Sequence, residues 1–264
     1  MEQLILYVAT GAVIGVIAGL MGIGGGIVVV PVLTLIFTTL HFPHEHLLHL
    51  ALGTSLATIL FTSVSSVRAH HVRGAVNWDV VKQLTPGVLI GTLAGTWVAA
   101  QLTTPMLKSI FIVFAYYVAV QMLLNVKPKP TRQLPASGGL LVAGHAVGGF
   151  SSLVGIGGGT VLVPLMTMCN VAMHTAVGTA AAVGFPIALA GTAGYIANGF
   201  VAGGLPEYSF GYVYLPAFVG IAVTSMLTAP LGARLAHALP VAQLKKVFAV
   251  VLVLVATRML LEIV

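Results

Sequence analysis

The feature that most constrains this chain is the length of its runs without a charged side chain. Residues 3–44, 83–107 and 133–206 contain no Asp, Glu, Lys or Arg. A helix needs about 20 apolar residues to cross about 30 Å of hydrocarbon, so each run can hold one or more membrane spans. The strands of a membrane barrel would alternate polar and apolar residues, and these runs do not. The pattern predicts an all-α polytopic membrane protein.

Composition excludes a soluble domain. Of the 264 residues, 58% are hydrophobic and 6% are charged, whereas soluble proteins carry about a quarter charged residues. The net charge of +6 would suggest nucleic acid as a partner of a soluble protein. Here the basic residues cluster in loops, so we expect the lipid bilayer as a partner and no nucleic acid. The single cysteine, Cys169, excludes an intrachain disulfide and a cysteine metal cluster.

The chain repeats itself. The segment Leu20-Met21-Gly22-Ile23-Gly24-Gly25-Gly26, with Pro31 five residues on, recurs 133 residues later as Leu153-Val154-Gly155-Ile156-Gly157-Gly158-Gly159, followed by Pro164. A second pair of matching blocks, Gly53-Thr54 and Gly178-Thr179, is preceded in the two halves by His49 and His174. Two such internal matches predict that both halves share one structural plan.

Each half divides into the same series of apolar segments. A first helix is followed by a glycine loop, a short apolar segment, a long helix and a final pair of helices. In the first half we expect these at 4–21, 27–40, 46–68, 80–101 and 105–125; in the second, at 137–154, 160–170, 173–198, 210–236 and 240–262. The first membrane repeat then covers 1–126, a cytoplasmic linker 127–135, and the second repeat 136–264. With these elements we expect about 8–10 membrane segments.

The distribution of Lys and Arg predicts that the two halves have opposite orientations. The loop after the first long helix carries Arg68, Arg73 and Lys82, whereas its counterpart in the second half has no basic residue and carries Glu207. Short loops rich in Lys and Arg stay in the cytoplasm, so these two loops should lie on opposite sides. The chain is therefore predicted to be an inverted-topology repeat with both termini outside the cytoplasm.

The glycine loops have three readings. A nucleotide site is excluded, because Gly26 is followed by Ile27-Val28-Val29 and not by the Lys-Ser/Thr of a phosphate-binding loop. Glycines can also serve helix packing, which is our interpretation of Gly11, Gly15, Gly144 and Gly148 at four-residue spacing. For the duplicated loops we favour broken or re-entrant helix hairpins that line a central site. Exposed N–H groups and helix N-termini there would attract an anion.

Polar residues in the long helices complete the predicted site. Thr54 and Thr179 are duplicated, Ser55 has only Ala180 as its counterpart, and a protonated histidine could attract an anion or relay a proton. Hydroxyls that bond their own helix and histidines that lie at the membrane interface are the alternatives. The candidate substrate-binding residues are Gly22, Gly24, Gly25, Gly26, Thr54, Ser55, Gly155, Gly157, Gly158, Gly159, Thr179, His49 and His174.

Metal binding and enzymatic hydrolysis have little support in the sequence. The loop containing His41, His44, Glu45, His46 and His49 resembles a metal-ligand cluster, but Pro43 interrupts it and its geometry is not set. We expect neither a metal nor a cofactor. The sequence holds no Ser-His-Asp or His-Glu-x-x-His arrangement for hydrolysis in the membrane, so we expect that it is not an enzyme.

The two Gly-Ile-Gly-Gly-Gly blocks with Pro31 and Pro164, and the Gly-Thr blocks at 53 and 178, resemble those of the TauE/SafE family of sulfite and organosulfonate exporters. The resemblance covers nearly the whole chain. It implies a multi-pass carrier in the bacterial inner membrane for a small anion such as sulfite, a sulfonate or a related organic acid. An anion channel and an accessory membrane subunit that carries nothing are the alternatives.

Overall fold

The structure is a computed structural model that describes residues 2–21, 26–124, 133–238 and 241–262. These residues form ten helices and one short hairpin. The first half contains α1 (Glu2–Met21), α2 (Gly26–Thr39), α3 (Leu47–Val72), α4 (Trp78–Gln101) and α5 (Thr104–Leu124). The second contains α6 (Ser137–Val154), α7 (Gly159–Met168), α8 (Met173–Ala202), β1 (Ser209–Phe210), β2 (Val213–Tyr214), α9 (Leu215–Ala238) and α10 (Val241–Leu261). All ten predicted helices are present, and most of the linker predicted at 127–135 lies outside the described residues.

One predicted boundary is wrong. We expected a helix from residue 210, but residues 209–214 form an antiparallel pair in which Ser209 faces Tyr214 and Phe210 faces Val213. Gly211 supplies the turn with a positive φ of 56°, a conformation that glycine adopts without strain. Helix α9 starts after the hairpin, where Pro216 fits the first helical turn because its missing N–H would have no partner there.

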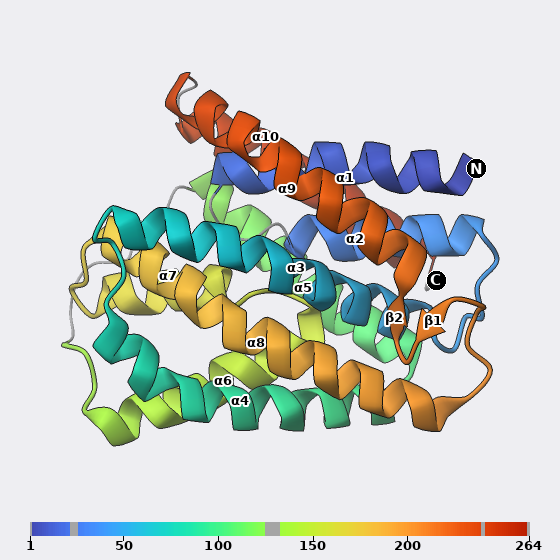
Figure 1. Cartoon of the computed structure of the whole chain (residues 1–264), viewed down its shortest axis with the longest axis horizontal. Coiled ribbons are helices and arrows are strands. Elements are labelled where there is room, and N and C mark those ends of the chain that lie inside the picture. The colour runs from blue at the N-terminus through green and yellow to red at the C-terminus, as the bar shows by residue number, and fades with distance from the viewer. Residues whose placement is uncertain (1, 22–25, 125–132, 239–240, 263–264) are drawn as a thin grey trace.

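The helices lie side by side along one axis (Figure 1), and the two ends of the bundle differ. The N- and C-termini, the α2–α3 connection and the β hairpin lie at one end, and the α3–α4 connection lies at the other. Helices α1 and α2 form a hairpin that returns to the end with the termini, whereas α6 and α7 return to the opposite end. The long helices α3 and α8 therefore run in opposite directions.

Packing crosses between the halves. Helix α1 packs along α9 and α4 packs along α6, while α3 packs against α8 and α5 against α10. The closest of these contacts depend on glycine: a Cβ on Gly91 would overlap the carbonyl of His145, and one on Gly144 would lie 2.5 Å from the carbonyl of Leu84. Gly11 and Gly15 meet α9 in the same way, and Gly148 meets α4, so the predicted packing role of these glycines is confirmed.

Four of the described helices are both long and apolar enough to cross a membrane: α3, α5, α6 and α8. Shorter apolar stretches lie in five of the other described helices, including 6–16 in α1, 215–228 in α9 and 248–261 in α10. Helix α3 and helix α8 are the most buried of the four long ones, because they lie between the other helices. Ile59 of α3 and Ile187 of α8 lie against the second glycine loop, at Gly157 and Gly158.

Candidate functional site

The second glycine loop interrupts the bundle between α6 and α7. Gly155 has a φ of 66° and its N–H donates to the carbonyl of Ser151, which ends α6. Gly158 has a φ of 73° and precedes α7 as its N-cap residue. Both conformations favour glycine because a Cβ is strained there. The loop reverses the chain within four residues, and the N-terminus of α7 lies inside the molecule.

Gly26, the one described glycine of the first loop, meets the second loop in the interior. Gly26, the first residue of α2, is buried, and a Cβ there would lie 2.8 Å from the Gly155 carbonyl oxygen and 3.2 Å from the Ile156 Cα. The side chain of Ile59 in α3 also lies within 2.6 Å of this position. The remaining predicted residues of this loop, Gly22, Gly24 and Gly25, lie outside the described residues. The start of α2 and the loop before α7 are thus neighbours.

Ser55 connects the first half to the loop of the second. Its hydroxyl donates to the carbonyl oxygen of Gly155 over 2.9 Å, and its side chain is fully buried. Ala180, its counterpart, has no hydroxyl, so this link exists in one half only. The bond holds the Gly155 carbonyl, which would otherwise lack a partner after α6 ends.

Thr54 and Thr179 make matching contacts, each with the opposite half. The Thr54 hydroxyl oxygen accepts from the backbone N–H of Tyr214 and the Thr179 hydroxyl oxygen from that of Asn77, both over 3.0 Å. Both threonines are fully buried. The preceding glycines, Gly53 and Gly178, allow the approach, since a Cβ would overlap the carbonyls of Tyr212 and Ala75. Each Gly-Thr block thus binds the segment that follows the other half's long helix.

The two histidines have different surroundings. His49 is 3% exposed, its Nε2 lies 2.9 Å from the Ala99 carbonyl oxygen, and its ring stacks on Tyr212 at 5.0 Å. Its Nδ1 has no hydrogen-bond partner within the described part of the chain. His174, near the start of α8, is exposed. Because α3 and α8 begin at opposite ends of the bundle, the two side chains do not share a site (Figure 1).

Tyr212, in the turn of the β hairpin, lies beside His46 and His49. Its hydroxyl lies 3.4 Å from Nδ1 of His46, and burial raises the pKa of its phenol, so Tyr212 stays neutral. His41 and His44 in the same loop are exposed. Within the described ranges, no three His, Cys, Asp or Glu side chains lie close enough together to hold a metal ion.

Ser151 is a candidate that the pattern of repeats did not identify. It lies in the last turn of α6, is fully buried, and its hydroxyl has no hydrogen-bond partner among the described residues. Its oxygen lies 3.5 Å from the position that a Cβ on Gly158 would occupy. Its counterpart in the first repeat, 133 residues earlier, is Ala18. A serine in one repeat where the other has an alanine is a difference between the halves that could have identified Ser151 from the sequence.

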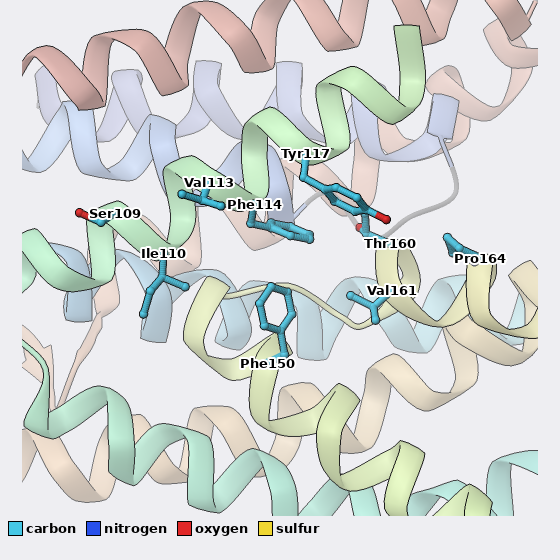
Figure 2. A pocket seen from close by; sticks show the side chains of 9 residues that line it. All are labelled: Ser109, Ile110, Val113, Phe114, Tyr117, Phe150, Thr160, Val161 and Pro164. Carbon is cyan, nitrogen blue, oxygen red and sulfur yellow. The ribbon is translucent and has the colours of Figure 1, made fainter. Parts of the chain in front are cut away.

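A separate cavity of about 630 Å³ lies between α5, α6 and α7. Figure 2 shows Phe114 and Phe150 next to each other in its lining, where their rings make an edge-to-face contact with centroids 5.2 Å apart, and Val161 and Pro164 of α7 complete the lining. Val113 and Tyr117 at its rim are 70% and 61% exposed on the outside of the bundle. An apolar lining that opens to lipid accepts hydrocarbon chains and offers little to a small anion. The candidate anion site is therefore at the glycine loops.

A bundle of apolar helices, in which α2 begins at a buried glycine and α7 begins after a buried glycine loop, defines a multi-pass α-helical membrane protein. The family described as "Sulfite exporter TauE/SafE" matches residues 7–259. The chain belongs to this family.

Several relatives match over most of the chain. A "Probable membrane transporter protein" of Haemophilus influenzae is 37% identical over 262 residues, which cover 98% of each protein. The "Probable membrane transporter protein YdhB" of Bacillus subtilis is 30% identical and covers 88% of this chain and 90% of its own. A relative in Methanocaldococcus jannaschii is 26% identical, covering 87% of this chain and 85% of its own. No solved structure matches the chain.

Proposed function

We propose that this protein is a secondary transporter that moves a small anion across the plasma membrane by alternating access, and that the two glycine loops hold the anion. The single observation that carries the proposal is the contact between Gly26 and the Gly155–Ile156 backbone, where the start of α2 meets the loop between α6 and α7 in the interior. Broken helices at a repeat interface are the usual substrate site of transporters. Helix N-termini favour negative charge.

The arrangement of the halves supports alternating access. Thr54 and Thr179 each accept a hydrogen bond from a backbone N–H of the opposite half. The first helix of each half packs on the fourth helix of the other, as α1 on α9 and α6 on α4. If these pairs are related by a two-fold axis in the membrane plane, the repeats are inverted. Such a protein has two equivalent conformations that open to opposite sides.

The charged residues at the two ends of the bundle indicate how the protein is oriented in the membrane. Arg68 is in the last turns of α3 and Arg73 follows it in the α3–α4 connection, whereas Glu45 is in the α2–α3 connection and Glu207 directly precedes the β hairpin. The first of these connections lies at one end of the bundle, and the second lies with the hairpin and both termini at the other. By the preference of basic residues for the cytoplasm, the termini are outside. The names of the family and of its relatives support transport. The family name makes sulfite the first substrate to test, and the resemblance to organosulfonate exporters adds a sulfonate.

The experiment is flux into vesicles that contain the purified protein. Sulfite, sulfate, thiosulfate and sulfoacetate are each offered from outside, with and without the same anion inside. A carrier shows saturation, and internal anion accelerates uptake by counterflow. Flux that rises linearly with the gradient and shows no counterflow identifies a channel, and no flux of any of the four contradicts transport of this substrate class.

A further inference from the structure

The hydroxyl of Ser151 is an exception among the buried hydroxyls of this bundle. A serine or threonine inside a helix usually donates to a carbonyl three or four residues earlier. Ser152 donates in this way to Gly149 and Thr58 to Thr54, over 2.8 and 2.9 Å. Ser151 is equally buried, but its oxygen has no partner within the described part of the chain. An unpaired hydroxyl in an apolar interior costs free energy, so a partner that the protein does not itself supply is expected.

The surroundings of Ser151 identify what kind of partner is missing. Its oxygen lies beside Gly158, the N-cap of α7, and no side chain caps that helix. The first hydrogen bonds of α7 to the loop run from Val161 and Leu162 to the Gly158 carbonyl. In the described structure, the backbone N–H groups of residues 157–160 therefore have no acceptor. One hydroxyl and a run of N–H donors lie together at the positive end of a helix.

The other buried hydroxyls without a partner lack this setting. Thr92 lies in the middle of α4 against Gly148 and Gly191, and Thr192 lies in the middle of α8. Neither position adjoins the first turn of a helix, where free N–H groups occur. Tyr7 lies within α1, and Ser209 lies in β1 opposite Tyr214, away from the glycine loops. Of these five hydroxyls in the described residues, Ser151 is the one that lies against the N-cap glycine of α7.

We propose that Ser151 and the N–H groups of residues 157–160 form a cradle that binds the oxygens of the transported anion. This inference rests on the proposed transport function and names its binding residues. All the donors are neutral, so the ligand class is a small oxyanion, such as a sulfite or sulfonate group, held without a buried cation. The hydroxyl donates one hydrogen bond and the helix N-terminus supplies positive partial charge.

The cradle belongs to the second half alone. Ala18 takes the place of Ser151 in the first half, and the first half instead contributes Ser55, which holds the Gly155 carbonyl. That bond occupies a carbonyl oxygen that would repel an anion. A Cβ on Gly158 would come within 2.5 Å of Ile187 and 3.5 Å of the Ser151 oxygen, so any side chain at this position would crowd the Ser151 hydroxyl.

Binding by purified protein tests the cradle through Ser151→Ala, with Ser152→Ala as the matched control. Sulfite, sulfate, thiosulfate and sulfoacetate are each added, and the rise in melting temperature reports binding. Wild type and Ser152→Ala are expected to be stabilised by the same anion with the same dissociation constant. Ser151→Ala is expected to bind about tenfold more weakly. Without anion, Ser151→Ala should melt at the same or a higher temperature, because an unpaired hydroxyl has been removed. Ser151→Cys, which keeps the volume with a weaker donor, should fall between the two.

Equal affinity of Ser151→Ala and wild type overturns the cradle, as does the absence of any anion-induced shift in the wild type. Neither result by itself contradicts transport, because vesicle flux of the wild type decides that separately. If the wild type transports the anion and Ser151→Ala binds it as tightly as the wild type, the transport function holds and the anion binds at another site. No flux, together with a Ser151-dependent shift, identifies a binding protein that does not transport.

Discussion

At the scale of the residue, the backbone conformations of single glycines determine the shape of the candidate site. Gly158 and Gly74 both have positive φ angles, 73° and 65°, but only Gly158 is surrounded by side chains. Gly158→Ala should lower anion flux by about tenfold, which corresponds to about 1.4 kcal/mol of binding free energy. Gly74→Ala has the same backbone strain and no neighbour within 4 Å, so its flux per folded molecule should match the wild type. Equal flux in both variants would mean that the loop before α7 does not line the site.

The bond from Ser55 to Gly155 makes a second prediction at this scale. Ser55→Ala leaves a buried carbonyl without a donor and should reduce the stability of the protein by about 1–3 kcal/mol. Thr58→Ala removes a hydroxyl that bonds to its own helix, where the carbonyl of Thr54 can keep its backbone partner, so its effect should be smaller. Thermal unfolding in detergent measures both. A larger loss of stability in Thr58→Ala than in Ser55→Ala would contradict a stabilising role for the bond from Ser55 to Gly155.

At the scale of the element, the segments after the two long helices are held by threonines of the opposite half. Thr54→Val and Thr179→Val each remove the acceptor of one backbone N–H, that of Tyr214 or of Asn77. Because valine has a similar volume, both variants should lose about 1–3 kcal/mol of stability, and by similar amounts. Thr34→Val, which loses only a bond to the Val30 carbonyl in its own helix, is the control. Strongly unequal losses would show that the two contacts are not equivalent.

The boundaries of the helices could be predicted because their causes are local. Runs of apolar residues interrupted by Gly22–Gly26 and Gly155–Gly159 predict where α2 and α7 begin, and the side chain of Asn77 accepts from the N–H of Val80 to start α4. The β hairpin at residues 209–214 was missed. Its residues are as apolar as a helix start, and the bond from the Tyr212 N–H to the Tyr195 carbonyl comes from packing against α8.

At the scale of the whole molecule, the two ends of the bundle should lie on opposite sides of the membrane. In a Cys169→Ser background, Glu207→Cys and Val72→Cys place single exposed thiols at the two ends. An impermeant thiol reagent added to intact cells should label the cysteine at 207 and not the one at 72, which should react only after the membrane is permeabilised. Labelling of both from one side would contradict the inverted repeat.

The sequence by itself determined the class of the protein, the number and order of its helices, and the position of the two glycine loops. These features depend on the length of apolar runs and on glycines that recur along the chain, which are local properties. Only the tertiary structure decided which polar atoms have partners. Thr54 bonds to a residue 160 positions away, whereas Ser151 meets no partner among the described residues. Hydrogen bonds over such separations depend on how α3, α6 and α8 pack, and a buried hydroxyl is paired or unpaired according to the neighbours that folding brings to it.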